Sequence, residues 1–186
     1  ATRDELTGAF NRRHFLQVAE REWARCRRYA EDGVLLLVDA DRLKAVRNHH
    51  GGHCSDALLR EMARVVSQSL RQPDLLGRFG AETMAVYLPN TDPMGALDVA
   101  ERVRERVAGH TLRLQNGGVS STVSIGVASL GATHVTLDAL VQDALAALQV
   151  AREAGRNCVR AAPIQPRATP ERPPSAASGG PRARRP

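Results

Sequence analysis

Two groups of charged side chains in this 186-residue chain have types and spacings suited to phosphorylated ligands. Lys44 is the single lysine beside 25 arginines, and an ammonium group is a natural point-charge partner for a phosphate. An arginine-rich composition that left one lysine by chance explains Lys44 equally well. Arg71 and Asp74 form an Arg-x-x-Asp pair, and a guanidinium fork also suits a phosphate.

A histidine-rich segment over residues 49–54 offers a different chemistry. It contains three imidazoles and a thiol, from His49, His50, His53 and Cys54, which are ligand types found in zinc sites. Their spacing matches no common zinc-finger pattern. We therefore interpret the segment as a solvated loop, with zinc binding as the alternative.

The composition indicates one folded domain and a tail. With 42% hydrophobic residues, residues 1–162 suffice for one domain with a core. Residues 163–186 hold seven of the ten prolines, five arginines and one glutamate, a net charge of +4 out of +6 for the chain. Such a segment is expected to be disordered. Because the remaining charge is only about +2, no nucleic-acid polymer is expected as a partner.

Cysteine usage and hydropathy predict a cytoplasmic domain. Three cysteines, an odd number without metal-site spacing, fit a reducing compartment. The longest apolar run, residues 34–38, is too short to span a bilayer, and no signal peptide is visible. The first residue is not methionine, so we expect an upstream sensor domain. Its attachment to a membrane would make this the cytoplasmic part of a membrane-anchored sensor.

Apolar periodicity predicts an α/β fold with a mixed sheet. Apolar residues at steps of four, four, three and four, beginning at Phe15, mark a helix over about residues 11–31. The run 34–38 is typical of a strand buried on both faces. Further helices are expected near 56–70, 93–107 and 137–154, and further strands near 75–79, 83–88, 119–128 and 157–161.

Residues 78–84 resemble the signature hairpin of the GGDEF family, which includes the diguanylate cyclases that join two GTP molecules into cyclic di-GMP. Residues 4–13, 38–44, 122–128 and 155–157 are similar to other motifs of the family and occur in the same order. The resemblance thus covers residues 4–161. It implies a nucleotidyl-cyclase-like fold, with a central mixed sheet of five to six strands flanked by helices and the signature hairpin near residues 75–88.

The resemblance implies phosphoryl transfer, in which a ribose hydroxyl attacks an α-phosphate and pyrophosphate leaves. Asp39, the backbone carbonyl of Ala40, and Glu82 match the family's Mg²⁺ positions, and Glu82 also matches a catalytic acid. For Asp39 the alternative is a strand-end acid that caps a helix, and for Asp41, the second acid of that motif, it is a structural role. The residues at substrate-binding positions are Lys44, Arg47, Asp56, Gly80, Ala81, Arg152 and Arg156.

Three departures from the family pattern predict impaired or lost cyclase activity. Thr83 replaces the second signature acid, and losing such a group commonly costs ~10²–10⁴-fold in rate. Ala81 replaces the second glycine, which would strain the hairpin if its φ were positive. Arg47 replaces the guanine-reading asparagine; it can still pair with guanine O6 and N7, although a bulkier cation would fill the slot.

Arg71, Asp74 and Arg102 match the family's inhibitory site, where an Arg-x-x-Asp pair and a second arginine hold cyclic di-GMP. The site is unaltered, so the resemblance implies a cyclic di-GMP receptor. Inheritance from an active ancestor would also leave it intact. Two alternatives are a weak diguanylate cyclase that positions Mg²⁺ and GTP through Asp39, Lys44 and Glu82, and a GTP-binding regulator without catalysis. A homodimer is a further expectation.

Overall fold

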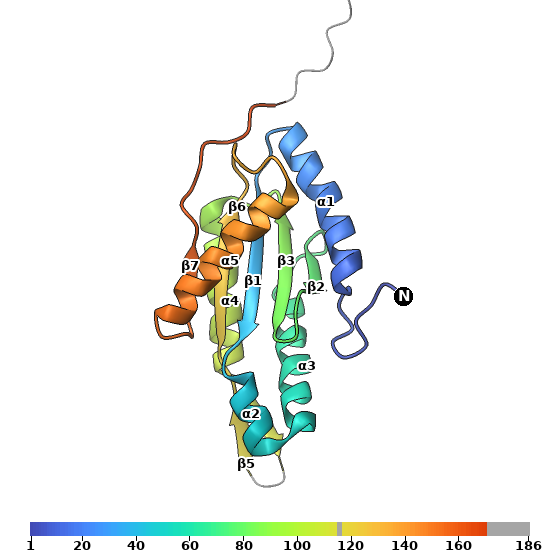
Figure 1. Cartoon of the computed structure of the whole chain (residues 1–186), viewed down its shortest axis with the longest axis vertical. Coiled ribbons are helices and arrows are strands. Elements are labelled where there is room, and N and C mark those ends of the chain that lie inside the picture. The colour runs from blue at the N-terminus through green and yellow to red at the C-terminus, as the bar shows by residue number, and fades with distance from the viewer. Residues whose placement is uncertain (115–116, 171–186) are drawn as a thin grey trace, which may run out of the picture.

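The computed structural model describes residues 1–114 and 117–170, which fold around a five-stranded sheet (Figure 1). The strand order is β2-β3-β1-β6-β7, and only β6 and β7 are paired in parallel. The strands are β1 (Gly33–Ala40), β2 (Leu75–Arg78), β3 (Thr83–Pro89), β6 (Val123–Ser129) and β7 (Val159–Ala161). A separate ribbon pairs β4 (Thr111–Leu114) with β5 (Gly117–Ser120). The mixed α/β sheet predicted from the sequence is confirmed.

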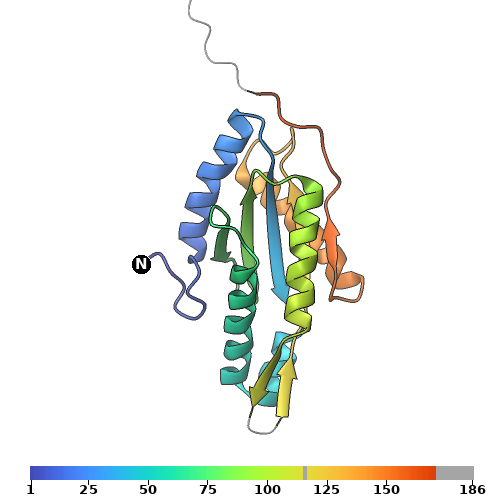
Figure 2. The same ribbon diagram turned by 180° about the vertical axis from the view of Figure 1, so that it is seen from behind.

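Helices cover both faces of the sheet (Figures 1 and 2). One face carries α1 (Arg12–Arg28) and α5 (Leu137–Glu153), and the other carries α3 (Gly52–Gln68) and α4 (Pro93–Ala108). All eight residues of β1 are buried. Val34, Leu36 and Val38 join the core under α3 and α4, while Leu35 and Leu37 join the core under α1 and α5. Burial on both sides explains the continuous apolar run of this strand.

Side-chain caps define where three helices begin. Asn11 accepts a hydrogen bond from the backbone of His14 at the start of α1, and Asp92 and Thr136 do the same for α4 and α5. Such caps satisfy backbone N–H groups that lack a partner within the helix.

The histidine-rich segment is helical, so its interpretation as a loop was wrong. Helix α2 (Leu43–His50) contains the first two histidines, and α3 begins at Gly52. Only Leu43 of α2 is buried, which leaves too little apolar periodicity to predict the helix from sequence. The expected strand over 119–128 is also divided, because residues 121–122 separate β5 from β6.

Residues 163–168, the beginning of the segment expected to be disordered, lie against the end of the domain. Ala132 donates a backbone hydrogen bond to Pro166 (2.8 Å), and Arg167 pairs with Asp32 (2.9 Å). Residues 171–186 lie outside the described part, so their predicted disorder stays a prediction, as does the domain boundary at residue 162. None of the described helices is long and apolar enough to span a bilayer.

Candidate functional site

The pairing of β1 with β3 brings the predicted metal ligands to one edge of the sheet. Asp39 lies directly opposite Thr83 in the antiparallel ladder. The backbone N–H of Ala40 donates to the carbonyl of Glu82 (2.9 Å). Residues that are more than 40 positions apart in sequence therefore meet where β1 ends and the signature hairpin turns.

Both carboxylate oxygens of Asp39 already have partners from other elements. Oδ1 accepts a hydrogen bond from the Thr83 hydroxyl (2.8 Å). Oδ2 accepts from Arg152 of α5, through Nε (3.0 Å) and Nη2 (2.9 Å). The side chains are 9% exposed for Asp39 and 33% for Arg152. Asp39 accepts no backbone N–H among the described residues, so it is the partner of a cation rather than a helix cap.

This arrangement does not fit Mg²⁺. Magnesium prefers carboxylate and water oxygens in octahedral geometry, whereas here a guanidinium lies against Asp39 and a neutral hydroxyl donates to it. Of the two predicted carboxylate ligands, Glu82 has no side-chain hydrogen bond or ion pair inside the described ranges. In that part of the chain no three His, Cys, Asp or Glu side chains are placed to hold a metal ion, and this includes the histidine-rich segment.

Asp41 has a structural role. Its Oδ1 accepts from Ser124 (2.6 Å), and its Oδ2 accepts from Thr122 (2.7 Å) and from the backbone of Asn157 (3.0 Å). The carboxylate thereby joins the end of β1 to the start of β6 and to the turn before β7. This fixes the position of α5, which ends just before that turn and carries Arg152.

The signature hairpin is closed by backbone bonds. Phe79 and Gly80 both donate to the carbonyl of Thr83 (2.8 and 3.1 Å), and Arg78 donates to the carbonyls of Gly80 (3.2 Å) and Ala81 (3.1 Å). Ala81 is not among the residues with positive φ. The strain expected from replacing this glycine is therefore absent, and the hairpin accepts alanine without distortion.

Arg78 also ties the N-terminal segment to the hairpin. Its Nη1 lies 3.2 Å from Oδ1 of Asp4. Burial would raise the pKa of Asp4, but hydrogen bonds from Thr7 and the charge of Arg78 outweigh it and hold the pKa below its ordinary value.

The remaining substrate-binding candidates point into solvent. Lys44 and Arg47 on α2, Asp56 on α3, and Arg156 in the turn after α5 are exposed, and none forms a side-chain hydrogen bond or ion pair within the described residues. Arg156 has a positive φ of 65°, which directs the chain sharply into β7. These cations remain available to an anionic ligand.

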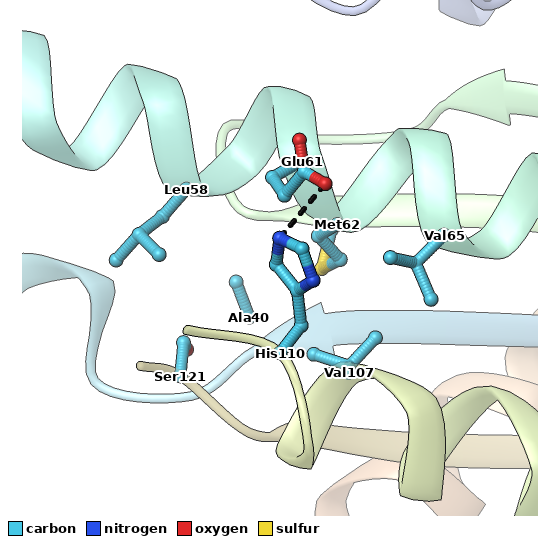
Figure 3. Close-up of a pocket in the computed structure, with 8 residues that line it drawn as sticks. All are labelled: Ala40, Leu58, Glu61, Met62, Val65, Val107, His110 and Ser121. Carbon is cyan, nitrogen blue, oxygen red and sulfur yellow. Dashed lines mark ion pairs between the residues drawn. The ribbon is translucent and has the colours of Figure 1, made fainter. Parts of the chain in front are cut away.

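A small apolar pocket lies behind Ala40, on the side of the sheet that faces α3 (Figure 3). Figure 3 shows His110 pointing toward Glu61 across this pocket, and the two side chains form an ion pair of 2.9 Å. A hydrogen bond from Arg64, with a smaller effect of His110, lowers the pKa of Glu61. The lining residues are Ala40, Leu58, Glu61, Met62, Val65, Val107, His110 and Ser121. The pocket shares only Ala40 with the predicted site residues.

The Arg-x-x-Asp pair is assembled at the other end of the sheet. Asp74 accepts from the backbone N–H (2.7 Å), Nε (3.4 Å) and Nη2 (2.9 Å) of Arg71, and Nη2 also donates to Pro89 O and Thr91 Oγ1 (2.8 Å each). The Asp74 side chain is 2% exposed, whereas that of Arg71 is 54% exposed. Asp74 therefore orients Arg71, and the Nη1 edge of the guanidinium carries no hydrogen bond to the described residues.

Arg102 lies near the same loop. It extends from α4 and donates to the carbonyl of Ser69 (3.3 Å), two residues before Arg71. Next to Arg71 is a surface pocket, here called the Arg71 pocket, lined by Asp32, Arg71, Leu88, Asn90, Thr91, Asp92, Gly95 and Val99. Asp32 precedes β1 and Asp39 is near its end, so the Arg71 pocket lies roughly 20 Å from the Asp39 edge.

Several contacts at the Asp39 edge and at the Arg71 pocket were not predicted from the sequence. Asp39 and Arg152 were predicted separately, without their ion pair, and Asp32 and Thr91 were not predicted. No short-range signal could have found these residues, because their roles arise from contacts between distant segments.

Comparison with known proteins identifies relatives that match most of this chain. The family model described as "Diguanylate cyclase, GGDEF domain" matches residues 1–158. The chain is 35% identical to the probable diguanylate cyclase DgcC of Escherichia coli K12, over 84% of this chain and 42% of DgcC. It is 32% identical to the response regulator PleD of Caulobacter vibrioides, over 86% of this chain and 36% of PleD. The chain therefore spans less than half the length of these relatives.

Solved structures show the same architecture. The GGDEF domain of DgcB from Caulobacter crescentus, determined in complex with cyclic di-GMP, superposes with a TM-score of 0.83 at 26% identity, covering 88% of this chain and 94% of that one. Diguanylate cyclase SiaD of Pseudomonas aeruginosa, determined with its activator SiaC, gives a TM-score of 0.83 at 36% identity, covering 87% of this chain and 62% of SiaD. The fold implied by the sequence resemblance is thereby confirmed.

Proposed function

Because the chain belongs to the GGDEF diguanylate cyclase family of cyclic di-GMP signalling, we propose that it acts in this signalling as a cyclic di-GMP receptor that lacks cyclase activity. The observation that carries the proposal is the state of Asp39, whose carboxylate is held by the Arg152 guanidinium and the Thr83 hydroxyl.

The loss of cyclase activity follows from the charges at the Asp39 edge. Phosphoryl transfer depends on positioning and on stabilising the charge that develops on the triphosphate. The position opposite Asp39, where the family has an acid, holds Thr83. A hydroxyl adds no negative charge to bind a dication, and Arg152 already neutralises Asp39.

Receptor activity is supported by the geometry around Arg71. Asp74 holds the guanidinium in one orientation with its Nη1 edge open. A pre-oriented guanidinium loses less side-chain entropy when it binds, and its fork matches phosphate oxygens or the O6 and N7 atoms of guanine. Arg102 adds a second guanidinium near the same loop, and the partly exposed Val99 adds apolar surface for a base.

Calorimetry with cyclic di-GMP tests the receptor proposal. Arg71→Ala should weaken binding at least about thirtyfold, because removing one partner of a desolvated charged contact commonly costs 2–5 kcal/mol. Asp39→Ala should leave affinity unchanged, because it lies at the far end of β1. Arg160→Ala is the matched control, since within the described ranges this exposed arginine on β7 bonds only to a neighbouring carbonyl. Equal affinity of wild type and Arg71→Ala, or no binding by wild type, contradicts the proposal.

A cyclase assay with GTP and Mg²⁺ tests the other half of the proposal. We expect no cyclic di-GMP above background. Product formed at about 1 s⁻¹ or faster, an ordinary rate for an enzyme, would show that the Asp39 edge rearranges to bind metal and that the weak-cyclase alternative is correct.

A GTP-binding regulatory domain is the second candidate function. It is favoured by the exposed side chains of Lys44, Arg156 and Asp56, none of which has a partner among the residues that the structure describes. If it is correct, GTP binds equally well in the presence of Mg²⁺ or EDTA, and Lys44→Ala weakens binding while Arg71→Ala does not. A homodimer, an upstream sensor domain and a cytoplasmic location stay predictions from the sequence.

A further inference from the structure

The segment after β7 runs back along the end of the domain and docks there (Figures 1 and 2). Ala132 donates to the carbonyl of Pro166 (2.8 Å), and the backbone of Thr133 donates to Oε1 of Gln165 (3.2 Å). A Cβ added to Gly131 would lie 2.6 Å from that of Gln165, so glycine allows this close approach. Ala168 is buried. Residues 163–168 are here called the C-terminal strap.

The strap places one charged side chain at the rim of the Arg71 pocket. Nη2 of Arg167 lies 2.9 Å from Oδ2 of Asp32, and Asp32 lines that pocket. The main chain of Asp32 is also held, because its carbonyl accepts from the backbone of Asn90 (2.8 Å). This bond holds the backbone of Asp32 beside the pocket independently of Arg167.

The carboxylates of the Arg71 pocket are neutralised by different means. Asp92 accepts from the backbone of Gly95 (2.6 Å) at the N-terminus of α4, where the helix dipole favours a negative charge. Asp74, next to the pocket, is paired with Arg71. Asp32 has one side-chain partner among the described residues, Arg167. Without Arg167, an uncompensated negative charge would face any anionic ligand held by Arg71.

We propose that Arg167 is a specificity-determining residue of the cyclic di-GMP site. It acts as the counter-ion of Asp32 and so allows the Arg71 pocket to accept a ligand with two phosphates. This inference rests on the proposed receptor function. It makes the strap part of the binding site, although residues 163–168 follow the portion of the chain that matches the GGDEF family.

The expected effect is modest and sensitive to salt. Both side chains of the pair are partly exposed, so Arg167→Ala should weaken cyclic di-GMP binding about twofold to fivefold, as for other exposed charge interactions. The difference should shrink as ionic strength rises, because exposed charges are screened over about 10 Å at 0.1 M salt.

A double-mutant cycle tests the counter-ion role by calorimetry with cyclic di-GMP. Wild type, Arg167→Ala, Asp32→Asn and the double variant are compared, with Arg160→Ala as the control for loss of one surface arginine. Asp32→Asn should bind at least as tightly as wild type. In the Asp32→Asn background, Arg167→Ala should have no effect, because no carboxylate remains to be neutralised.

Each outcome separates this inference from the receptor proposal. If wild type binds, Arg71→Ala does not, and Arg167→Ala binds like wild type, the receptor proposal stands and the counter-ion role is overturned. A loss on Arg167→Ala that persists in the Asp32→Asn background also overturns that role, since it means that Arg167 acts independently of Asp32. Absence of binding by wild type overturns both.

Discussion

The guanidinium of Arg152 lies 2.9 Å from the carboxylate of Asp39, across 113 positions of sequence. This pair joins the end of α5 to the end of β1. It provides, from within the chain, the positive charge that a cyclase of this family would obtain from a bound dication. Together with the Thr83 hydroxyl, it supplies a partner for each carboxylate oxygen of Asp39.

The Asp39 edge should bind Mg²⁺ only when both side chains that contact Asp39, those of Thr83 and Arg152, are changed. We expect Mg²⁺ at millimolar concentration to leave the melting temperature of wild type unchanged, because an ion stabilises a fold only if it binds the folded state. Thr83→Glu with Arg152→Met supplies a second carboxylate and removes the competing cation. This double variant should gain a Mg²⁺-dependent rise in melting temperature and bind Mn²⁺ by electron paramagnetic resonance. A Mg²⁺ shift in wild type would show that Arg152 yields to the metal.

Breaking the Asp39–Arg152 pair should destabilise the domain. Arg152→Met leaves the buried carboxylate of Asp39 without its cation. Because Arg152 is one-third exposed, we expect the free energy of unfolding to fall by about 1–3 kcal/mol, less than for a fully buried pair. Urea unfolding measures this change in the free energy of unfolding. Arg156→Ala is the control, since this exposed side chain has no partner in the described part of the chain, and it should stay within about 0.5 kcal/mol of wild type.

Two truncations of the C-terminus should differ in melting temperature. Removal of residues 171–186 deletes only proline- and arginine-rich sequence and should leave the melting temperature unchanged. Removal of residues 163–186 also deletes the strap contacts with Ala132, Thr133 and Asp32. We expect a further fall of several degrees, since about 1 kcal/mol corresponds to 2–4 °C in a domain of this size. Equal melting temperatures for both truncations would mean that the strap contributes nothing to stability.

Acid should weaken the attachment of the N-terminal segment. The pKa of Asp4 is lowered in the folded state, where Thr7 and Arg78 outweigh the opposing effect of burial. A lowered pKa contributes stability above the ordinary carboxyl pKa, and that stability is lost as pH falls through the folded value. Urea midpoints should therefore decline below about pH 4, and Asp4→Asn should be less stable than wild type at pH 7 and show a smaller decline. An identical pH profile for Asp4→Asn would contradict this assignment.

The exposed cations near α2 allow a final test of nucleotide binding. If the receptor proposal is correct, Lys44→Ala should leave cyclic di-GMP affinity unchanged, because Lys44 follows the end of β1 that is remote from Arg71. Calorimetry with cyclic di-GMP compares the affinities of Lys44→Ala, Arg71→Ala and wild type. A loss in Lys44→Ala without a loss in Arg71→Ala would place the ligand at the Asp39 edge instead.

Several features of this protein follow from its sequence alone, because the signals are local. The apolar steps that begin at Phe15 predict α1, and the run Val34–Val38 predicts a strand buried on both faces, as observed. The absence of an acid at position 83 is also visible in the sequence. By contrast, α2 has a single buried residue, so its pattern is too weak to predict a helix.

Only the tertiary structure decided which side chains are paired. The register of β1 with β3 places Thr83 opposite Asp39, and the packing of α5 brings Arg152 to the same carboxylate. The strap likewise carries Arg167 to Asp32 over 135 positions. Apolar periodicity and helix caps depend on residues that are close in sequence. Pairs such as Asp39–Arg152 depend on sheet register and helix packing, which bring distant segments together. No short segment of sequence therefore encodes them.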